Sequence, residues 1–171
     1  MYKINLLIIM VCVSFIFSAE FITNEVDEFT GDTIKQTEYN MIVSSFSETF
    51  YMSFKKVNQN YALHLKMMIG ILSISEGARL ILKLSDNSTI TLDALSSEVS
   101  CKGCGAPGFV GSGAYGIHQR YRINKEQIKI LSSTKVSMIR VYTNKGYFSN
   151  DIRERRQDSI KDIASLIIDK N

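Results

Sequence analysis

The chain has 171 residues, of which 45% are hydrophobic and 22% are charged, with three cysteines, two histidines and one proline. This length suits one domain, and the near-average composition argues against a disordered chain, collagen, a coiled coil or a multi-pass membrane protein. The formal net charge of +3 is too small for a typical nucleic-acid-binding domain, which clusters basic residues on one face. We therefore expect a globular protein without nucleic acid among its partners.

The first 19 residues are typical of a secretory signal peptide. Lys3 precedes an apolar run over 6–17, and small residues lead to Ala19. The run is shorter than the ~20 residues of a membrane-spanning helix, and no later segment is long and apolar enough to span. We expect cleavage after Ala19 and export of a single domain, residues 20–171, to the periplasm, cell surface or medium. Lipid attachment at Cys12 and a retained N-terminal anchor are the alternatives.

Antiparallel strands are predicted for most of the remaining chain. Apolar and polar residues alternate over 61–69, as in a strand with one face on a core. A further strand is expected over 47–57, with a turn at 58–60. Polar turns also separate short β-forming runs in three expected hairpins: 26–29 with 33–36, 80–84 with 89–92, and 136–142 with 146–148.

Two helices are expected. Asn124 and Gln127 have the spacing of a capping box, which predicts a short helix near 124–132. Near the C-terminus, apolar residues recur at the spacing of an amphipathic helix: Ile160, Ile163, Ala164 and Ile167. Arginines just upstream would oppose the positive end of the helix dipole, so we expect this helix to begin near Gln157 or Asp158. The predicted fold class is α+β, mainly an antiparallel sheet of hairpins, sandwich-like or barrel-like.

One loop concentrates the glycines. Six of the ten glycines and the only proline lie between Gly103 and Gly116, and the run matches G-x-G-x-x-G twice. A dinucleotide fingerprint needs a helix directly after the loop, whereas residues 117–123 alternate like a strand. Crowded backbone N–H groups still favour anions, and three basic side chains would share one face of that strand. The predicted ligand contacts are Gly103, Gly105, Gly111, Gly113, His118, Arg120 and Arg122. The alternative is a structural loop beside a solvated basic face.

Cys101 and Cys104 form a Cys-x2-Cys motif. In an exported chain that has lost Cys12, an even count favours a disulfide between them. A redox-active pair and half of a zinc site are the alternatives. Zinc would need two more ligands, and His64 and His118 are distant in the sequence. We therefore predict no metal and no cofactor, and expect His64, on the polar face of its strand, to lie at the surface.

No arrangement of residues indicates catalysis. Val110 stands where a G-x-S-x-G nucleophile elbow needs its first glycine. Acidic residues around Gly31 lack the ladder of an EF-hand. The catalytic set is accordingly predicted to be none.

Four segments, VDEFTG at 26–31, SCKGCG at 100–105, GSGAYG at 111–116 and IRVYT at 139–143, resemble a group of small exported bacterial proteins. The resemblance implies a β-rich exported module and carries over no activity or site residue. We predict an exported, non-enzymatic binding or structural module, whose partner is an anionic small molecule, a glycan or an envelope protein. The alternatives are a thiol-redox or metal-binding protein, and a protein-binding inhibitor or adhesin.

Overall fold

The computed structural model describes residues 19–108 and 113–168. The predicted signal peptide, apart from Ala19, and the predicted ligand contact Gly111 lie outside these residues. Within the described part, the chain forms thirteen strands and two helices. The predicted α+β class, rich in antiparallel sheet, is confirmed.

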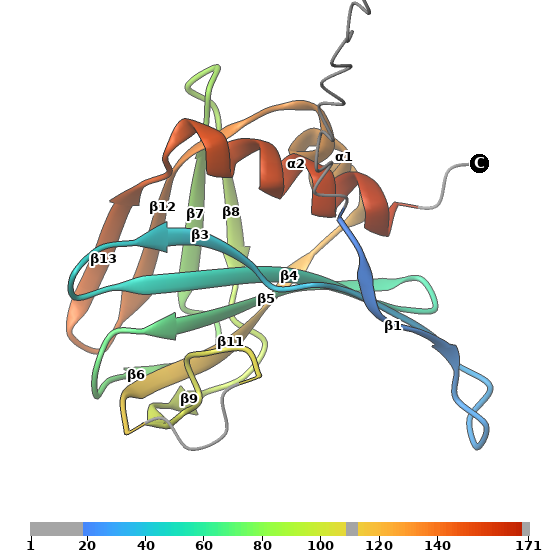
Figure 1. Cartoon of the computed structure of the whole chain (residues 1–171), viewed down its shortest axis with the longest axis horizontal. Helices are drawn as coiled ribbons and strands as arrows, with labels where there is room; N and C mark the ends of the chain where they lie inside the picture. Colours follow the sequence, from blue (N-terminus) through green and yellow to red (C-terminus); the bar gives the residue numbers. More distant parts are fainter. Residues whose placement is uncertain (1–18, 109–112, 169–171) are drawn as a thin grey trace, which may run out of the picture.

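Two larger sheets and one small one make up the β-structure (Figure 1). The first sheet contains β1 (Phe21–Val26), β2 (Thr33–Thr37), β3 (Asn40–Ser44), β4 (Thr49–Val57), β5 (Asn60–Met68), β10 (Cys101–Lys102) and β11 (Tyr115–Ile123). Its order is β1-β2-β4-β5-β11-β10, and β3 also pairs with β4. The second sheet contains β7 (Arg79–Leu84), β8 (Thr89–Asp93), β12 (Val136–Thr143) and β13 (Gly146–Asp151). Its order is β13-β12-β7-β8, while β6 (Ser73–Ile74) pairs with β9 (Glu98–Val99).

A short junction joins the two larger sheets. Ala94, just after β8, forms an antiparallel bridge with Tyr121 of β11. The N–H of Leu95 donates to the carbonyl of Arg120 at 2.9 Å. Inward-facing residues of both sheets form one hydrophobic core, to which β5 contributes Leu63, Leu65 and Met67. The alternation predicted for 61–69 is thereby confirmed for the core-facing residues.

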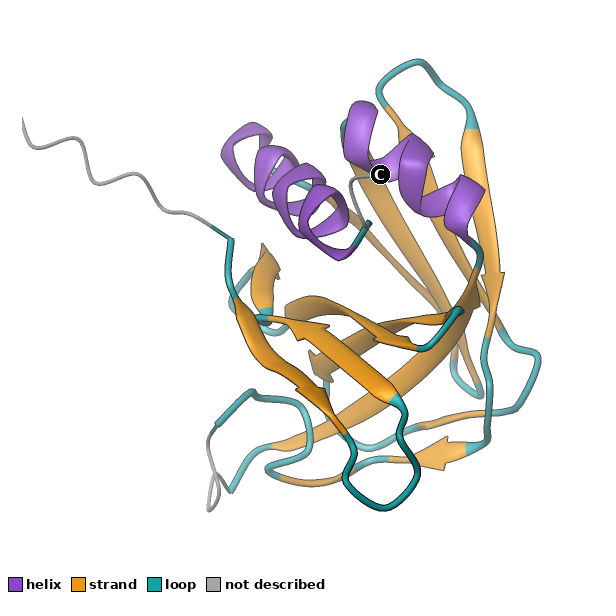
Figure 2. Cartoon of the chain, turned by 90° about the vertical axis from the view of Figure 1, so that its right-hand side faces the viewer, coloured by secondary structure: helices purple, strands orange, loops and turns teal. Residues whose placement is uncertain are grey.

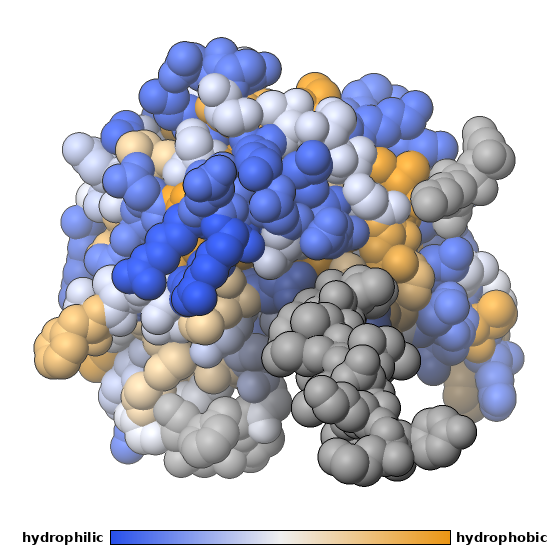
Figure 3. Space-filling model, turned by 45° about the horizontal axis from the view of Figure 1, so that its top comes forward, coloured by the Kyte–Doolittle hydropathy of each residue, from blue (hydrophilic) through white to orange (hydrophobic). Residues whose placement is uncertain are grey.

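The helices α1 (Lys125–Ser133) and α2 (Glu154–Ile167) lie on the same side of the strands (Figure 2). The predicted capping box is present: the N–H of Gln127 donates to Asn124 Oδ1 at 2.8 Å, and the N–H of Asn124 donates to Gln127 Oε1 at 3.0 Å. The surface over the helices is largely hydrophilic (Figure 3), as expected for amphipathic helices that turn residues such as Ile128 and Ile160 toward the core. Neither described helix is long and apolar enough to cross a lipid bilayer.

Two predicted boundaries were wrong. Helix α2 begins at Glu154, not near Gln157 or Asp158. The carboxylate of Glu154 in the first turn favours the helix start, and the Arg156 side chain is buried, with 8% of its surface exposed. The first strand of the first hairpin also ends earlier than the expected range of 26–29. Strand β1 ends at Val26, and the side chain of Asp27 accepts from the N–H groups of Phe29 and Thr30 in the turn.

Gly105 and Gly116 allow the glycine-rich loop to approach the sheet closely. Both are buried. A Cβ atom added to either glycine would overlap the carbonyl oxygen of Met67 in β5 and the backbone of the other glycine. At these two positions, glycine is required because backbone packs directly on backbone.

We predict that Gly105→Ala destabilises the protein by about 1–3 kcal/mol, the usual range for a side chain forced into packed space. Gly113→Ala is the matched control, because a Cβ atom there meets nothing within 4 Å. Urea unfolding followed by circular dichroism measures both. Equal midpoints for the two variants would contradict the close approach.

Candidate functional site

The pairing of β5 with β11 places the two histidines of the chain side by side. In this antiparallel ladder Arg120 lies opposite His64, and His118 lies opposite Lys66. Side chains of opposed residues share a face of the sheet, and this face is the one that points away from Leu63 and Leu65. His64 Nδ1 and His118 Nε2 lie 3.2 Å apart, although 54 positions separate the residues.

Tyr39 reaches the same point from the segment between β2 and β3. Its hydroxyl oxygen lies 3.4 Å from His64 Nδ1 and 3.3 Å from His118 Nε2. The ammonium group of Lys66 lies 4.6 Å from the centre of the Tyr39 ring, within the range of a cation–π contact. We refer to Tyr39, His64 and His118 as the His–Tyr cluster.

His64 is buried, with 7% of its surface exposed. The prediction that it lies at the surface was wrong. Alternation correctly placed its side chain on the face away from the core, but Tyr39 and His118 cover that face here. His118 and Tyr39 are themselves half-buried.

Burial and neighbouring positive charge keep both imidazoles neutral. Burial is the main cause that lowers the pKa of His64 to about 3, and His118, Lys55, Arg120 and Lys66 add electrostatic repulsion. The pKa of His118 falls to about 4, first through burial and then through Lys66 and Arg120, with partial compensation by Glu98. The potential at the His–Tyr cluster is therefore positive.

Burial likewise raises the pKa of Tyr39 to about 12. Its phenol is therefore protonated at neutral pH. In this state it offers the histidines one donor hydrogen and an acceptor oxygen.

Two depressions meet at the histidines of this cluster, and Tyr39 lines another one together with Lys66. The smaller, which we call the histidine cleft, has a volume of about 410 Å³ and is lined by His64, Glu98, Val99, Cys101, Cys104, His118 and Arg120. The larger, the basic groove, has a volume of about 740 Å³. Its charged lining residues are Lys55, Arg120, Arg122, Lys125 and Glu126. Because His64 and Arg120 line both, the two depressions adjoin.

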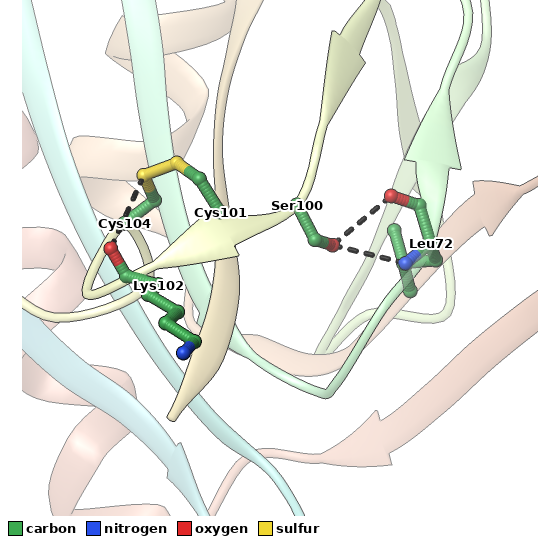
Figure 4. Close-up of a disulfide and its surroundings, with 5 residues drawn as sticks. All are labelled: Leu72, Ser100, Cys101, Lys102 and Cys104. Atoms are coloured by element: carbon green, nitrogen blue, oxygen red, sulfur yellow. Dashed lines mark hydrogen bonds between the residues drawn. A yellow bond between two sulfur atoms is a disulfide. The ribbon is translucent and has the colours of Figure 1, made fainter. Parts of the chain in front are cut away.

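Cys101 and Cys104, whose disulfide is drawn in Figure 4, form part of the wall of the histidine cleft. Cys101 and Cys104 are bonded, with their Cα atoms 5.4 Å apart, which confirms the predicted pairing. The preceding Ser100 fixes this strand to its neighbour: its hydroxyl donates to the carbonyl of Leu72 and accepts from the N–H of Leu72, each at 3.0 Å.

Arg120 is held at the edge of the cleft by polar contacts. Its Nη2 lies 3.7 Å from Glu98 Oε1 and donates to Ser96 Oγ at 3.3 Å. The Ser96 hydroxyl in turn donates to Glu98 Oε1 at 3.0 Å. About half of the Arg120 side chain is exposed, so its remaining donors can reach a ligand.

The predicted ligand contacts do not all lie in one depression. His118 and Arg120 line the histidine cleft, and Arg122 lines the basic groove. Gly103 donates its N–H to the carbonyl of Ala114 at 3.0 Å, and Gly113 lines a different depression, beside Phe46 and Tyr115.

Sequence reasoning missed six contributors to the site: Tyr39, Lys55, His64, Lys66, Glu98 and Lys125. The alternation that placed His64 and Lys66 on one strand face was the available signal for Lys66. Tyr39 had no local signal, because its position depends on how the β2–β3 connection folds back over the sheet.

Comparison of the chain with protein-family models, curated proteins and solved structures found no match. The chemistry of the cleft and the groove is therefore the basis for inferring function.

We predict that acid destabilises the fold through the two histidines. Their pKa values are lower in the native state than the ordinary 6.5, so below pH 6.5 the unfolded chain binds more protons and stability falls. Above pH 6.5 they contribute no pH dependence. For His64 the loss approaches ~1.4 kcal/mol per pH unit, and the partly exposed His118 contributes less because solvent screens its charge.

Urea unfolding between pH 7 and pH 4.5 measures this dependence. The double variant His64→Gln/His118→Gln should flatten it, because glutamine does not titrate. Identical pH dependence in both proteins would exclude the histidines as the cause.

Proposed function

We propose that this protein is an exported, non-enzymatic binding module that holds an anionic ligand on the outer face of β5 and β11. The observation that carries the proposal is the convergence of cationic and imidazole side chains on adjoining concave surfaces. Burial is the main cause of the lowered pKa of both histidines, and an anion placed there would relieve the second cause, repulsion by the nearby cations.

The composition of the site favours an anion over a neutral ligand. Four cationic side chains and a single carboxylate line the basic groove, and low-dielectric walls strengthen the field of such an arrangement. Arg120 belongs to both depressions, and its guanidinium presents the planar donors that recognise carboxylate, phosphate or sulfate. We infer a ligand that carries such groups, either a small molecule or a segment of an acidic glycan.

Export is supported by two independent features of the chain. The N-terminal segment has the pattern of a signal peptide, and the cysteines that remain after its removal are joined by a disulfide. Disulfides persist mainly in oxidising compartments. The proposed place of action is therefore outside the cytoplasm.

We predict that Arg120→Ala/Arg122→Ala weakens anion binding by at least roughly 10- to 100-fold, since the loss of a single charge-assisted hydrogen bond already costs ~1.5–3 kcal/mol. Calorimetric titrations with phosphate, sulfated oligosaccharides and nucleotides, in the presence of a chelator, test this. Lys145→Ala/Arg155→Ala is the control: it removes the same charge from exposed positions that do not line the groove.

Affinity should also fall as the salt concentration rises, because the interaction is electrostatic. No binding by the parent protein, or equal binding by both double variants, would overturn the proposal.

A second candidate is thiol–disulfide exchange with a dithiol partner. It is favoured by the position of the Cys101–Cys104 disulfide in the same cleft as two imidazoles and Arg120, because positive charge stabilises a thiolate. Under our first proposal the disulfide is structural, and its reduction potential should lie below about −300 mV. Equilibration with a series of dithiol buffers measures it. A potential near that of dedicated oxidants, about −120 mV, would favour exchange instead.

A further inference from the structure

We propose that Tyr39, His64 and His118 form a binding site for a zinc ion. The phenol oxygen and two imidazole nitrogens are chemically suited to this metal, for which nitrogen and oxygen ligands are common. The site goes beyond the anion-binding function and does not depend on it.

The distances within the His–Tyr cluster match one face of a coordination tetrahedron. The three donor atoms lie 3.2, 3.3 and 3.4 Å from one another. In a tetrahedral zinc site with bonds of ~2.0–2.1 Å, neighbouring ligand atoms are roughly 3.3–3.4 Å apart. A zinc ion above the centre of this triangle can therefore bond to all three atoms with little movement of the side chains.

Hydrogen bonding alone does not account for three ligand atoms that all lie within 3.4 Å of one another. The phenol brings one hydrogen, and each facing imidazole nitrogen has either a hydrogen or a lone pair. The cluster can then form at most two well-directed hydrogen bonds, although it has three close edges. A metal ion interacts favourably with all three atoms at once.

Within the part of the chain that the structure describes, other donor sets do not provide an equivalent site. In 19–108 and 113–168, no group of three or more histidine, cysteine, aspartate and glutamate side chains is arranged to hold a metal ion. We therefore assign Tyr39 as the third zinc ligand, beside the two histidines. Cys101 and Cys104 line the same cleft, but their thiols are joined in a disulfide.

The charge around the cluster determines what completes the coordination. Lys66 lies over the Tyr39 ring, and Arg120 lines the cleft beside both histidines. These cations disfavour a bare dication, but they favour one that carries an anion. Binding should also release the phenol proton, because zinc stabilises the phenolate. We infer that the fourth position holds hydroxide or another small anion, directed toward Arg120.

The test is calorimetric titration of Zn²⁺ into the full chain, without an affinity tag, oxidised and carrying Cys12→Ser so that no free thiol competes. The chain has only two histidines, so a histidine-dependent signal reports this pair. We expect one zinc per chain, with binding weakened more than ~100-fold by His118→Gln, beyond the usual effect of an outer-shell residue.

Tyr39→Phe should likewise weaken binding more than ~100-fold, as expected for a direct ligand. Tyr147→Phe should have no effect, because Tyr147 is exposed on β13 and packs on Tyr142 and Arg140. Ultraviolet difference spectra give a second readout that does not depend on variant folding. Zinc should produce the phenolate signal of one tyrosine in the parent protein, and Tyr39→Phe should abolish it.

Two results would overturn the site: no binding at equimolar zinc, or undiminished binding by a folded His118→Gln variant. These results are distinguishable from failure of the anion proposal. The anion titrations contain a chelator, and the zinc titrations contain no added phosphate, sulfate or glycan.

Discussion

The register between β5 and β11 is the constraint on which the candidate site depends. Successive side chains of a strand point to opposite faces, so a shift of one residue would exchange the two faces of β11. His118 and Arg120 would then face the core, and Tyr121, which is completely buried, would face solvent. The hydrophobic cost of that exchange fixes the register. Core packing thereby determines the position of two histidines that contribute nothing to the core.

The glycine-rich loop supports this register from one end. Gly105 lies against Gly116 and the Met67 carbonyl, with no space for a side chain. The backbone of the loop can therefore cross directly over the end of the β5–β11 ladder, where Cys101 pairs with Gly116. The disulfide limits the freedom of the same turn. These contacts explain part of the glycine concentration through packing, without a ligand.

The sequence predicted elements whose stability depends on local patterns. Alternation identified β5, polar turns identified the hairpins, and Asn124 with Gln127 identified the start of α1. The two-residue strands β6, β9 and β10 are too short to show a period, and only their partners define them. The start of α2 was misplaced because one local effect, the helix dipole, was considered without the burial of Arg156.

The candidate site was partly predictable for the same reason. The basic face of β11 follows from alternation within one strand, so His118, Arg120 and Arg122 were identified correctly as neighbours. His64 joins these three residues because β5 pairs with β11. It is buried because Tyr39 packs against it. Both are long-range properties. Alternation shows which face a side chain occupies, but not which other segment covers that face.

The electrostatics of this face are unfavourable for folding and are unnecessary for the core. Burial, and after it the charges of Lys66 and Arg120, lowers the pKa values of His64 and His118. Apolar side chains at these positions would avoid the cost of burying polar groups beside like charges. Groups whose pKa values are displaced by burial and by like charge are typical of functional sites, where strain within the free protein is relieved on binding. A bound anion would neutralise the lysine and arginine charges, and a metal ion would use the imidazole lone pairs that burial and those charges keep free of protons. The same arrangement of buried imidazoles and nearby cations would therefore favour both of the ligands that we propose, and a zinc-bound anion would satisfy both sets of side chains together.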